Sequence, residues 1–213
     1  MTAGASSLKV LGRASSINVR KVLWLCEELQ LPFVHEPLGT GLRSELPPDF
    51  DALNPNRLVP VLVDAGFVLW ESNTICRYLA AREGRSDLLP AAPPARARVE
   101  QWMDWQTTEL NNAWRYAFLS IVRQSPAHRD AEEVAASIVT WNRHMQIFER
   151  QLEATGAFAA GAEFTLADIV LGVAVHRWAQ TPIDRPDLPA VQAYYERLAQ
   201  RPGFAMHVRH GTP

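Results

Sequence analysis

The 213-residue sequence offers little that points to a membrane, a nucleic acid or an export route. Its longest apolar runs are too short to span a bilayer, and its N-terminus lacks the basic region followed by an apolar region that export requires. A formal net charge of -2 gives no electrostatic case for binding nucleic acid or an anionic membrane. We therefore expect a cytoplasmic protein that binds neither.

Cysteine is also scarce. The two cysteines, Cys26 and Cys76, are isolated, form no C-x-x-C motif and lie in helical patterns, so we expect two small, buried apolar side chains. The histidines show no metal-ligand spacing, and neither a Gly-rich phosphate loop nor a Ser-His-Asp order stands out. The sequence therefore predicts no metal site.

The composition, 47% apolar and 21% charged, is typical of a globular protein, and the length fits one large domain or two small ones. Residues 7–84 alternate strand and helix patterns. We expect strands at 8–12 and 31–38, with a helix at 16–31 between them and Ser16 as its N-cap. Parallel pairing of the two strands would make a right-handed βαβ unit.

The second part of this region predicts a hairpin. A polar stretch at 39–56 covers a short helix at 47–53, and strands at 59–64 and 67–72 flank an Asp-Ala-Gly turn. A helix at 72–83 closes the unit. The order of elements indicates a compact α/β domain.

The remainder of the chain is helical in pattern. The Pro- and Ala-rich stretch "GRSDLLPAAPPARAR" is typical of a linker. From residue 94 onward the sequence shows helical spacing and no strand pattern. We expect an all-α C-terminal part with helices at 95–124, 130–156, 165–180 and 188–202.

Four segments, in this order and at suitable spacing, resemble the cytosolic glutathione transferases along nearly the whole chain. They are "SSINVRKVLWLCEEL", "NPNRLVPVLVD", "WESNTICRYLA" and "FTLADI". "SINVRKV" is similar to the serine-using theta, delta and phi-like bacterial enzymes. The resemblance implies a thioredoxin-like glutathione-binding domain at 1–84 and an all-helical bundle domain at 94–213. It also implies glutathione as a co-substrate without another cofactor, a small apolar electrophile, and a homodimer.

Pro60 lies inside the apolar run "RLVPVLVD", where a proline is unusual because it removes a ladder donor. The resemblance implies a cis bond between Val59 and Pro60 that turns the N–H and C=O of Val59 outward. These groups would pair with the cysteinyl backbone of glutathione, as a peptide does at a sheet edge. The alternative is that Pro60 only ends an edge strand.

Ser16 is the residue that the resemblance implies for catalysis. Its hydroxyl would lie at the positive end of a helix and donate to the glutathione thiolate. A hydrogen bond to a charged group is worth roughly 1.5–3 kcal/mol, which lowers a thiol pKa by about one to two units. Two alternatives stay open for Ser16: it is only an N-cap, or Ser15 is the donor. Asn18 could support the thiolate or the loop, and capping is its alternative.

Glu71 and Ser72 are implied to bind the γ-glutamyl group. Ser72, as the cap of the next helix, would take the α-carboxylate, and Glu71 would meet the ammonium. The alternative for Ser72 is a plain cap. For the glycyl carboxylate the sequence departs from the family pattern, because Leu58 replaces the usual Lys or Gln and offers only its backbone. Arg43 or Arg57 could substitute, or be a solvated surface charge.

The second-substrate pocket is expected between the domains. Trp114 and Phe118, spaced i,i+4, are the preferred lining residues, with Asn111 and Arg115 to orient a polar electrophile. Core packing is the alternative for each aromatic residue, and Trp105 and Tyr116 were weaker candidates. In "FTLADI" a Thr165–Asp168 capping box is expected to be structural.

The same activated thiolate would also serve a peroxidase, a dehalogenase or an isomerase. Disulfide exchange is disfavoured, because Ser16 stands where such enzymes carry cysteine. A non-catalytic binding protein that keeps the fold is the alternative from another class.

Overall fold

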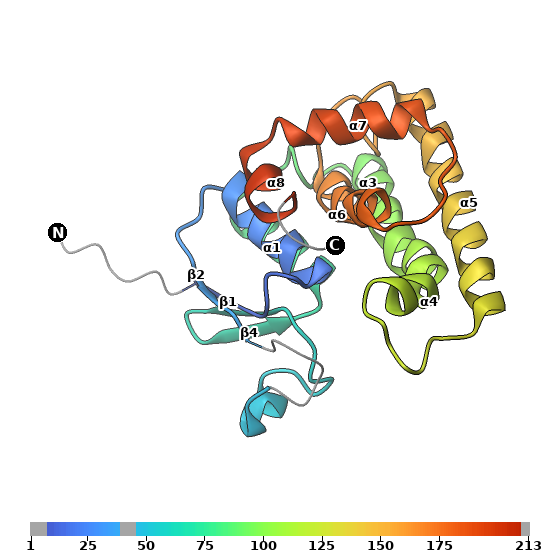
Figure 1. Ribbon diagram of the computed structural model, residues 1–213. Helices are drawn as coiled ribbons and strands as arrows, with labels where there is room; N and C mark the ends of the chain where they lie inside the picture. The colour runs from blue at the N-terminus through green and yellow to red at the C-terminus, as the bar shows by residue number, and fades with distance from the viewer. Residues whose placement is uncertain (1–7, 39–45, 210–213) are drawn as a thin grey trace. The chain divides into compact units, whose positions relative to one another are not determined.

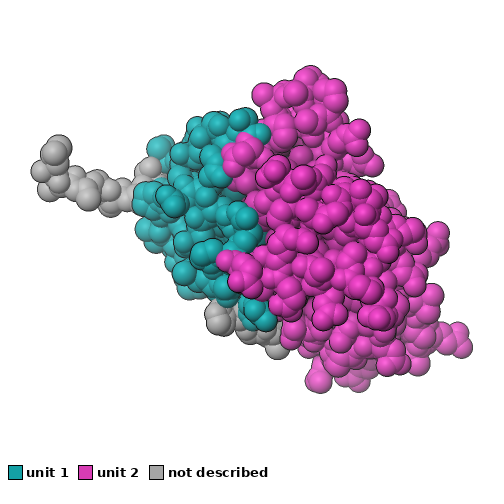
Figure 2. Space-filling view, turned by 90° about the horizontal axis from the view of Figure 1, so that it is seen from above, with its two compact units in different colours: residues 1–86, 201–211 teal, residues 87–200, 212–213 magenta. Residues whose placement is uncertain are grey.

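The computed structural model describes residues 8–38 and 46–209 and divides the chain into two compact units. The N-terminal unit comprises residues 1–86 with 201–211, and the C-terminal unit comprises 87–200 with 212–213 (Figure 2). The sequence predicts domains at 1–84 and 94–213, and the described residues 201–209 belong to the N-terminal unit.

The N-terminal unit is built on a four-stranded mixed sheet of order β2-β1-β3-β4 (Figure 1). Its strands are β1 (Leu8–Leu11), β2 (Val34–Glu36), β3 (Val61–Asp64) and β4 (Phe67–Trp70). The β1–β2 pair is parallel, as the predicted βαβ unit requires, and β3 runs antiparallel to both its neighbours. The β3–β4 turn has positive φ at Ala65 (48°) and Gly66 (91°), which suits a two-residue hairpin.

Two helices and a short 3-10 turn complete the sheet domain. They are α1 (Ile17–Glu28), η2 (Pro48–Ala52) and α2 (Ser72–Arg82), and α1 packs against α2. The predicted apolar face of α1 is buried, and so are both cysteines, which are free thiols. Burial raises the pKa of each thiol, that of Cys76 to about 12, so neither is a thiolate at neutral pH. The expectation of two buried small side chains is confirmed.

The last described segment returns to α1. Helix α8 (Pro202–His207) packs on α1, and the Trp24 and Phe204 rings meet edge-on with centroids 5.0 Å apart. Gly203 permits this approach, because a Cβ there would lie 2.5 Å from Cδ1 of Trp24.

The C-terminal unit is helical throughout its regular elements. They are α3 (Pro93–Trp105), the π-helical turn η3 (Gln106–Leu110), α4 (Asn111–Ile121), α5 (Ala131–Thr155), α6 (Leu166–Gln180) and α7 (Pro189–Ala199). Helix α6 is buried at every residue from 166 to 178, because its sequence is apolar on all sides. The predicted single helix at 95–124 is thus three successive elements. None of the described helices combines the length and apolar character needed to cross a bilayer.

Candidate functional site

Ser16 is the N-cap residue of α1, as predicted. Its carbonyl accepts the first helical bond from the N–H of Arg20 at 3.0 Å, and its own N–H donates to the carbonyl of Arg13 at 3.0 Å. Its side chain makes no capping hydrogen bond. The half-buried hydroxyl therefore lies at the positive end of a 12-residue helix without serving the helix itself.

The loop before α1 is fixed from two sides. The Nε of Arg20 donates to the carbonyl of Ala14 at 2.9 Å, and ring nitrogen Nε2 of His35 lies 2.7 Å from the carbonyl oxygen of Gly12. Ser15 and Asn18 are half-buried beside Ser16. The loop that carries both serines is thus anchored at its start and from within the helix.

Gly12, which sequence reasoning missed, brings β1, α1 and Val59 together. It has φ of 140°, and a Cβ there would lie 2.6 Å from Cγ2 of Val19 and 2.8 Å from Cβ of Val59. Only glycine fits such a backbone and such a contact. The signal in the sequence was a lone glycine directly after a strand.

The Val59–Pro60 peptide bond is cis, as predicted. Pro60 precedes β3, which lies between β1 and β4, so the alternative that Pro60 ends an edge strand is wrong. No hydrogen bond joins the main chain of Val59 to another described residue. Its N–H and C=O are therefore available to a peptide-like ligand.

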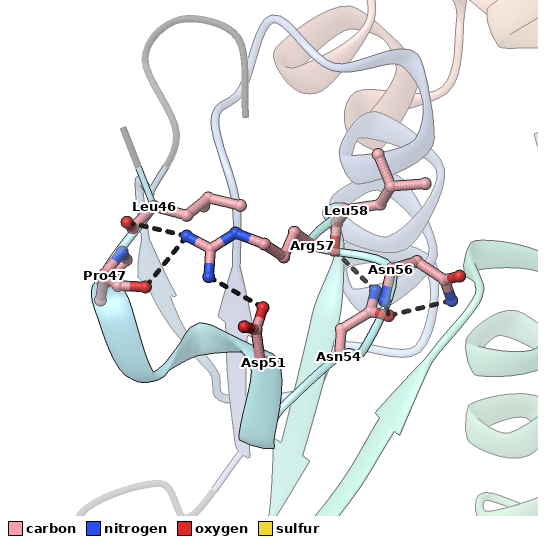
Figure 3. Close-up of polar contacts among 7 residues, drawn as sticks. All are labelled: Leu46, Pro47, Asp51, Asn54, Asn56, Arg57 and Leu58. Atoms are coloured by element: carbon pink, nitrogen blue, oxygen red, sulfur yellow. Dashed lines mark hydrogen bonds and ion pairs between the residues drawn. The ribbon is translucent and has the colours of Figure 1, made fainter. Parts of the chain in front are cut away.

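The turn before Val59 is held by its own side chains (Figure 3). The Nδ2 of Asn54 donates to the carbonyl of Leu58 at 2.8 Å, while its Oδ1 accepts from the N–H of Asn56 at 3.0 Å. Asn54 is buried, whereas the side chain of Leu58 is 49% exposed. The Leu58 carbonyl is thus engaged, which leaves only its N–H for a ligand.

Arg57 serves the same turn. Its guanidinium pairs with Asp51 at 2.8 Å and donates to the carbonyls of Leu46 at 3.2 Å and Pro47 at 3.3 Å (Figure 3). This engagement disfavours Arg57 as the cation for the glycyl carboxylate. The other candidate, Arg43, lies outside the described residues.

The start of α2 differs in one detail from the prediction. Glu71, and not Ser72, is the N-cap, and Ser72 is the first helical residue. Glu71 is exposed and has φ of 75°, a conformation that non-glycine residues rarely adopt and that is enriched at functional sites. Ser72 is 2% exposed, and its hydroxyl has no hydrogen-bond partner among the described residues. A buried hydroxyl without a partner at a helix N-terminus suits an anionic ligand.

The four residues predicted for the second substrate lie on α4. Trp114 and Phe118 are buried with ring centroids 5.4 Å apart, and the guanidinium carbon of Arg177 lies 4.5 Å and 3.9 Å from those centroids. Both rings thus contribute to the core of the C-terminal unit. Asn111 accepts from Nε2 of Gln106 at 2.6 Å, and Arg115 is exposed.

The two weaker aromatic candidates are half-buried and contact other rings of this unit. The Trp105 ring meets Trp102 at 5.0 Å, and the Tyr116 ring meets His128 at 4.9 Å. Core packing, the alternative stated for each aromatic residue, fits the buried Trp114 and Phe118, whereas Trp105 and Tyr116 are half-buried.

The Thr165–Asp168 capping box at the start of α6 is present, as predicted. The buried carboxylate of Asp168 accepts from the N–H groups of Ala159 and Thr165, both at 2.8 Å, and from Tyr194 at 3.2 Å. Burial raises the pKa of Asp168 to about 6, although these hydrogen bonds oppose the shift. The motif is structural.

Comparisons with known proteins agree along the chain. Residues 15–82 match the family model of the glutathione S-transferase N-terminal domain, and residues 131–197 match that of the C-terminal domain. Glutathione S-transferase GstB of Escherichia coli is 36% identical over 193 residues, which are 90% of this chain and 92% of that protein. The chain belongs to the glutathione S-transferase family.

Solved structures support the same assignment. One is the theta class glutathione S-transferase of Xanthomonas axonopodis pv. citri with glutathione bound. It superposes on this chain with a TM-score of 0.87 at 37% identity, and the match covers 98% of this chain and 100% of the Xanthomonas chain. Glutathione S-transferase 3 of Zea mays is 33% identical over 92% of this chain and 91% of that protein. The predicted family and fold class, a thioredoxin-like domain followed by an all-α glutathione S-transferase domain, are confirmed.

Proposed function

We propose that the protein is a glutathione transferase that holds glutathione along Val59 and activates its sulfur as a thiolate at the N-terminal end of α1. The observation that carries this proposal is the Ser16 hydroxyl, which lies at the helix N-terminus and makes no capping bond. A free thiol has a pKa near ~8.5, and the thiolate is the nucleophile. One donated hydrogen bond of about 1.5–3 kcal/mol lowers that pKa by about one to two units.

The rest of glutathione would follow the sheet margin. The main chain of Val59, which is hydrogen-bonded to no other described residue and precedes the cis bond to Pro60, would offer both a donor and an acceptor to the cysteinyl unit. The Ser72 hydroxyl and the first N–H groups of α2 would take the γ-glutamyl α-carboxylate, and Glu71 its ammonium. The Leu58 N–H and Arg43 are proposed for the glycyl carboxylate.

The reaction is nucleophilic displacement or addition at an apolar electrophile. The thiol proton passes to water and the thiolate sulfur forms a bond to carbon. In a displacement the leaving group departs with its bonding electrons, and in an addition the electron pair displaced onto the electrophile takes up a proton from water. The protein contributes positioning and stabilisation of the thiolate charge, since Ser16 can donate without ionising. Glutathione is the co-substrate, and no further cofactor is proposed.

The second substrate would bind beside α4, where Arg115 is exposed and Asn111 is half-buried. Asn18 would support the Ser16 loop, and Ser15 is the rival donor to the sulfur. We further propose a homodimer in the cytoplasm, because this arrangement is typical of the family and C2 pairs are the commonest assembly.

The test is a titration of bound glutathione by thiolate absorbance in the wild type, Ser16→Ala and Ser15→Ala. We expect the Ser16→Ala variant to raise the pKa of the bound thiol by about one to two units. Ser15→Ala should leave it within a few tenths. An unchanged thiol pKa in Ser16→Ala, with glutathione still bound, would remove Ser16 from this role. Conjugation of chlorodinitrobenzene separates a transferase from a protein that only binds glutathione.

A further inference from the structure

The chain contains only two lysines, and they lie in opposite environments. Lys9 on β1 has a side chain that is 47% exposed and pairs with Glu36 at 2.9 Å. Lys21 on α1 is 1% exposed, and its Nζ donates to Oδ1 of Asn73 at 3.3 Å inside the N-terminal unit. Burying a charged ammonium group costs desolvation free energy, so a buried lysine indicates a structural or functional role.

The position of the pair suggests that reason. Asn73 is the second residue of α2 and is 4% exposed. It directly follows Ser72, whose hydroxyl has no hydrogen-bond partner in the part of the chain that the structure describes. The Lys21 ammonium therefore lies beneath the first turn of α2. It adds positive charge to a helix end that already favours anions.

A third group reports the same proximity. Cys76, one turn further along α2, has a thiol whose pKa is raised mainly by burial, while the Lys21 charge lowers it and the Glu71 charge raises it. Both charges thus act on the same turn of the helix. One is buried below it, and the other is exposed at its start.

We propose that Lys21, acting through Asn73, is a positioning and charge-supplying residue for the γ-glutamyl α-carboxylate at the N-terminus of α2. The proposal rests on the proposed function, because it deepens the glutathione site. Lys21 does not touch the ligand. It orients the side-chain amide of Asn73 and makes the N-terminus of α2 more positive. Its contribution to binding affinity should therefore be specific to a ligand that carries the α-carboxylate.

A two-ligand comparison tests this. The ligands are glutathione and its analogue with a 4-aminobutyryl group in place of γ-glutamyl, which keeps the amine and lacks the α-carboxylate. By calorimetry, Lys21→Met should weaken glutathione binding on the order of tenfold, or about 1.4 kcal/mol. Binding of the analogue should change less than about twofold. Lys9→Met is the matched control and should change the affinity for neither ligand. In Lys21→Met, kcat at saturating glutathione should be retained while the affinity falls.

Asn73→Asp provides a second variant in case Lys21→Met does not fold. It keeps Lys21 and neutralises its charge, and an acidic residue in a first helical turn favours the helix. It should cause the same selective loss, whereas Lys21→Arg should restore most of the affinity. Equal loss of both ligands in the folded variants, or no loss of glutathione affinity, would overturn the proposal. A wild type that binds no glutathione would instead refute the proposed function.

Discussion

The carboxylate of Glu28, at the C-terminal end of α1, is held by two donors of Arg201, which is 173 residues away in the sequence. The Nε of Arg201 donates to Oε1 at 2.9 Å, and Nη2 donates to Oε2 at 2.7 Å. The indole N–H of Trp24 adds a third bond to Oε1 at 2.8 Å. Because Arg201 is the N-cap of α8, this pair fixes the returning segment to α1 within the N-terminal unit.

The first prediction concerns this pair. Arg201→Met should lower the free energy of unfolding by about 1–2 kcal/mol, because a bidentate ion pair with one carboxylate only 12% exposed is lost. Urea denaturation measures it. The control is Arg96→Met, which removes a partly exposed i,i+4 pair with Glu100 on one helix and should cost less than about 0.5 kcal/mol. Equal losses of unfolding free energy in the two variants would show that the bidentate Glu28–Arg201 geometry contributes no more stability than the Arg96–Glu100 pair.

The second prediction separates binding from stability at Ser72. The Ser72 hydroxyl is buried and has no partner within residues 8–38 and 46–209, so Ser72→Ala should change the free energy of unfolding by less than about 0.5 kcal/mol or raise it. The same variant should raise the KM for glutathione roughly tenfold or more, since a hydrogen bond to a charged carboxylate is lost.

Ser137→Ala is the matched contrast. The Ser137 hydroxyl donates to the carbonyl of Ala113 at 2.7 Å and accepts from the N–H of Ala117 at 3.1 Å. Its removal should cost about 1–2 kcal/mol of stability and leave the KM for glutathione unchanged. A Ser72→Ala variant that is destabilised as much as Ser137→Ala, with normal KM, would argue against a ligand role for Ser72.

The third prediction concerns pH. Burial raises the pKa of Asp64, but hydrogen bonds from Tyr78 (2.8 Å) and Arg82 and the charge of Arg82 outweigh it, so the pKa is held below its ordinary value of 3.8. Because folding lowers the pKa of Asp64, its ionised carboxylate stabilises the fold at pH values above its ordinary pKa. This stabilisation is lost as the pH falls through the lowered pKa.

The difference in unfolding free energy between wild type and Asp64→Asn should therefore be largest near neutral pH. It should shrink as pH falls below about 4. Urea titrations across that range measure it. Asp49→Asn, at an exposed position on η2, is the control and should change the free energy of unfolding by less than about 0.5 kcal/mol. A constant Asp64→Asn difference down to acid pH would contradict the assignment.

Much of the fold follows from local pattern. Helix α1 was expected at 16–31 and spans Ile17–Glu28, and the β3–β4 hairpin lies where the turn residues indicated. The strand expected at 31–38 is shorter, Val34–Glu36, because Pro32 and Pro37 cannot donate to a ladder. Periodicity also missed the π-helical turn Gln106–Leu110, because such turns are rare and residue spacing carries no specific signal for them.

The site was predictable where the backbone itself makes it. The residue pattern predicts the N-cap at Ser16 and the family resemblance implies the cis bond at Pro60, and both are present. The environments of charged side chains were not predictable, because burial depends on tertiary contacts that spacing does not reveal. Lys21 is buried although lysines are usually exposed, and Arg57 is engaged with two carbonyls across a turn.

The last prediction joins the fold to the site at Gly12. A Cβ there would press on Val19 and Val59 at 2.6 Å and 2.8 Å, and the backbone φ of 140° disfavours any side chain. Gly12→Ala should therefore destabilise the protein by about 2–3 kcal/mol and also displace Val59, raising the KM for glutathione severalfold. The control is Gly66→Ala, with φ of 91° and no atom within 4 Å of a new Cβ, which should cost only backbone strain of about 1 kcal/mol or more and leave KM unchanged. If both variants lost stability but kept the wild-type KM for glutathione, the contact between Gly12 and Val59 would not govern the position of the main chain with which glutathione pairs.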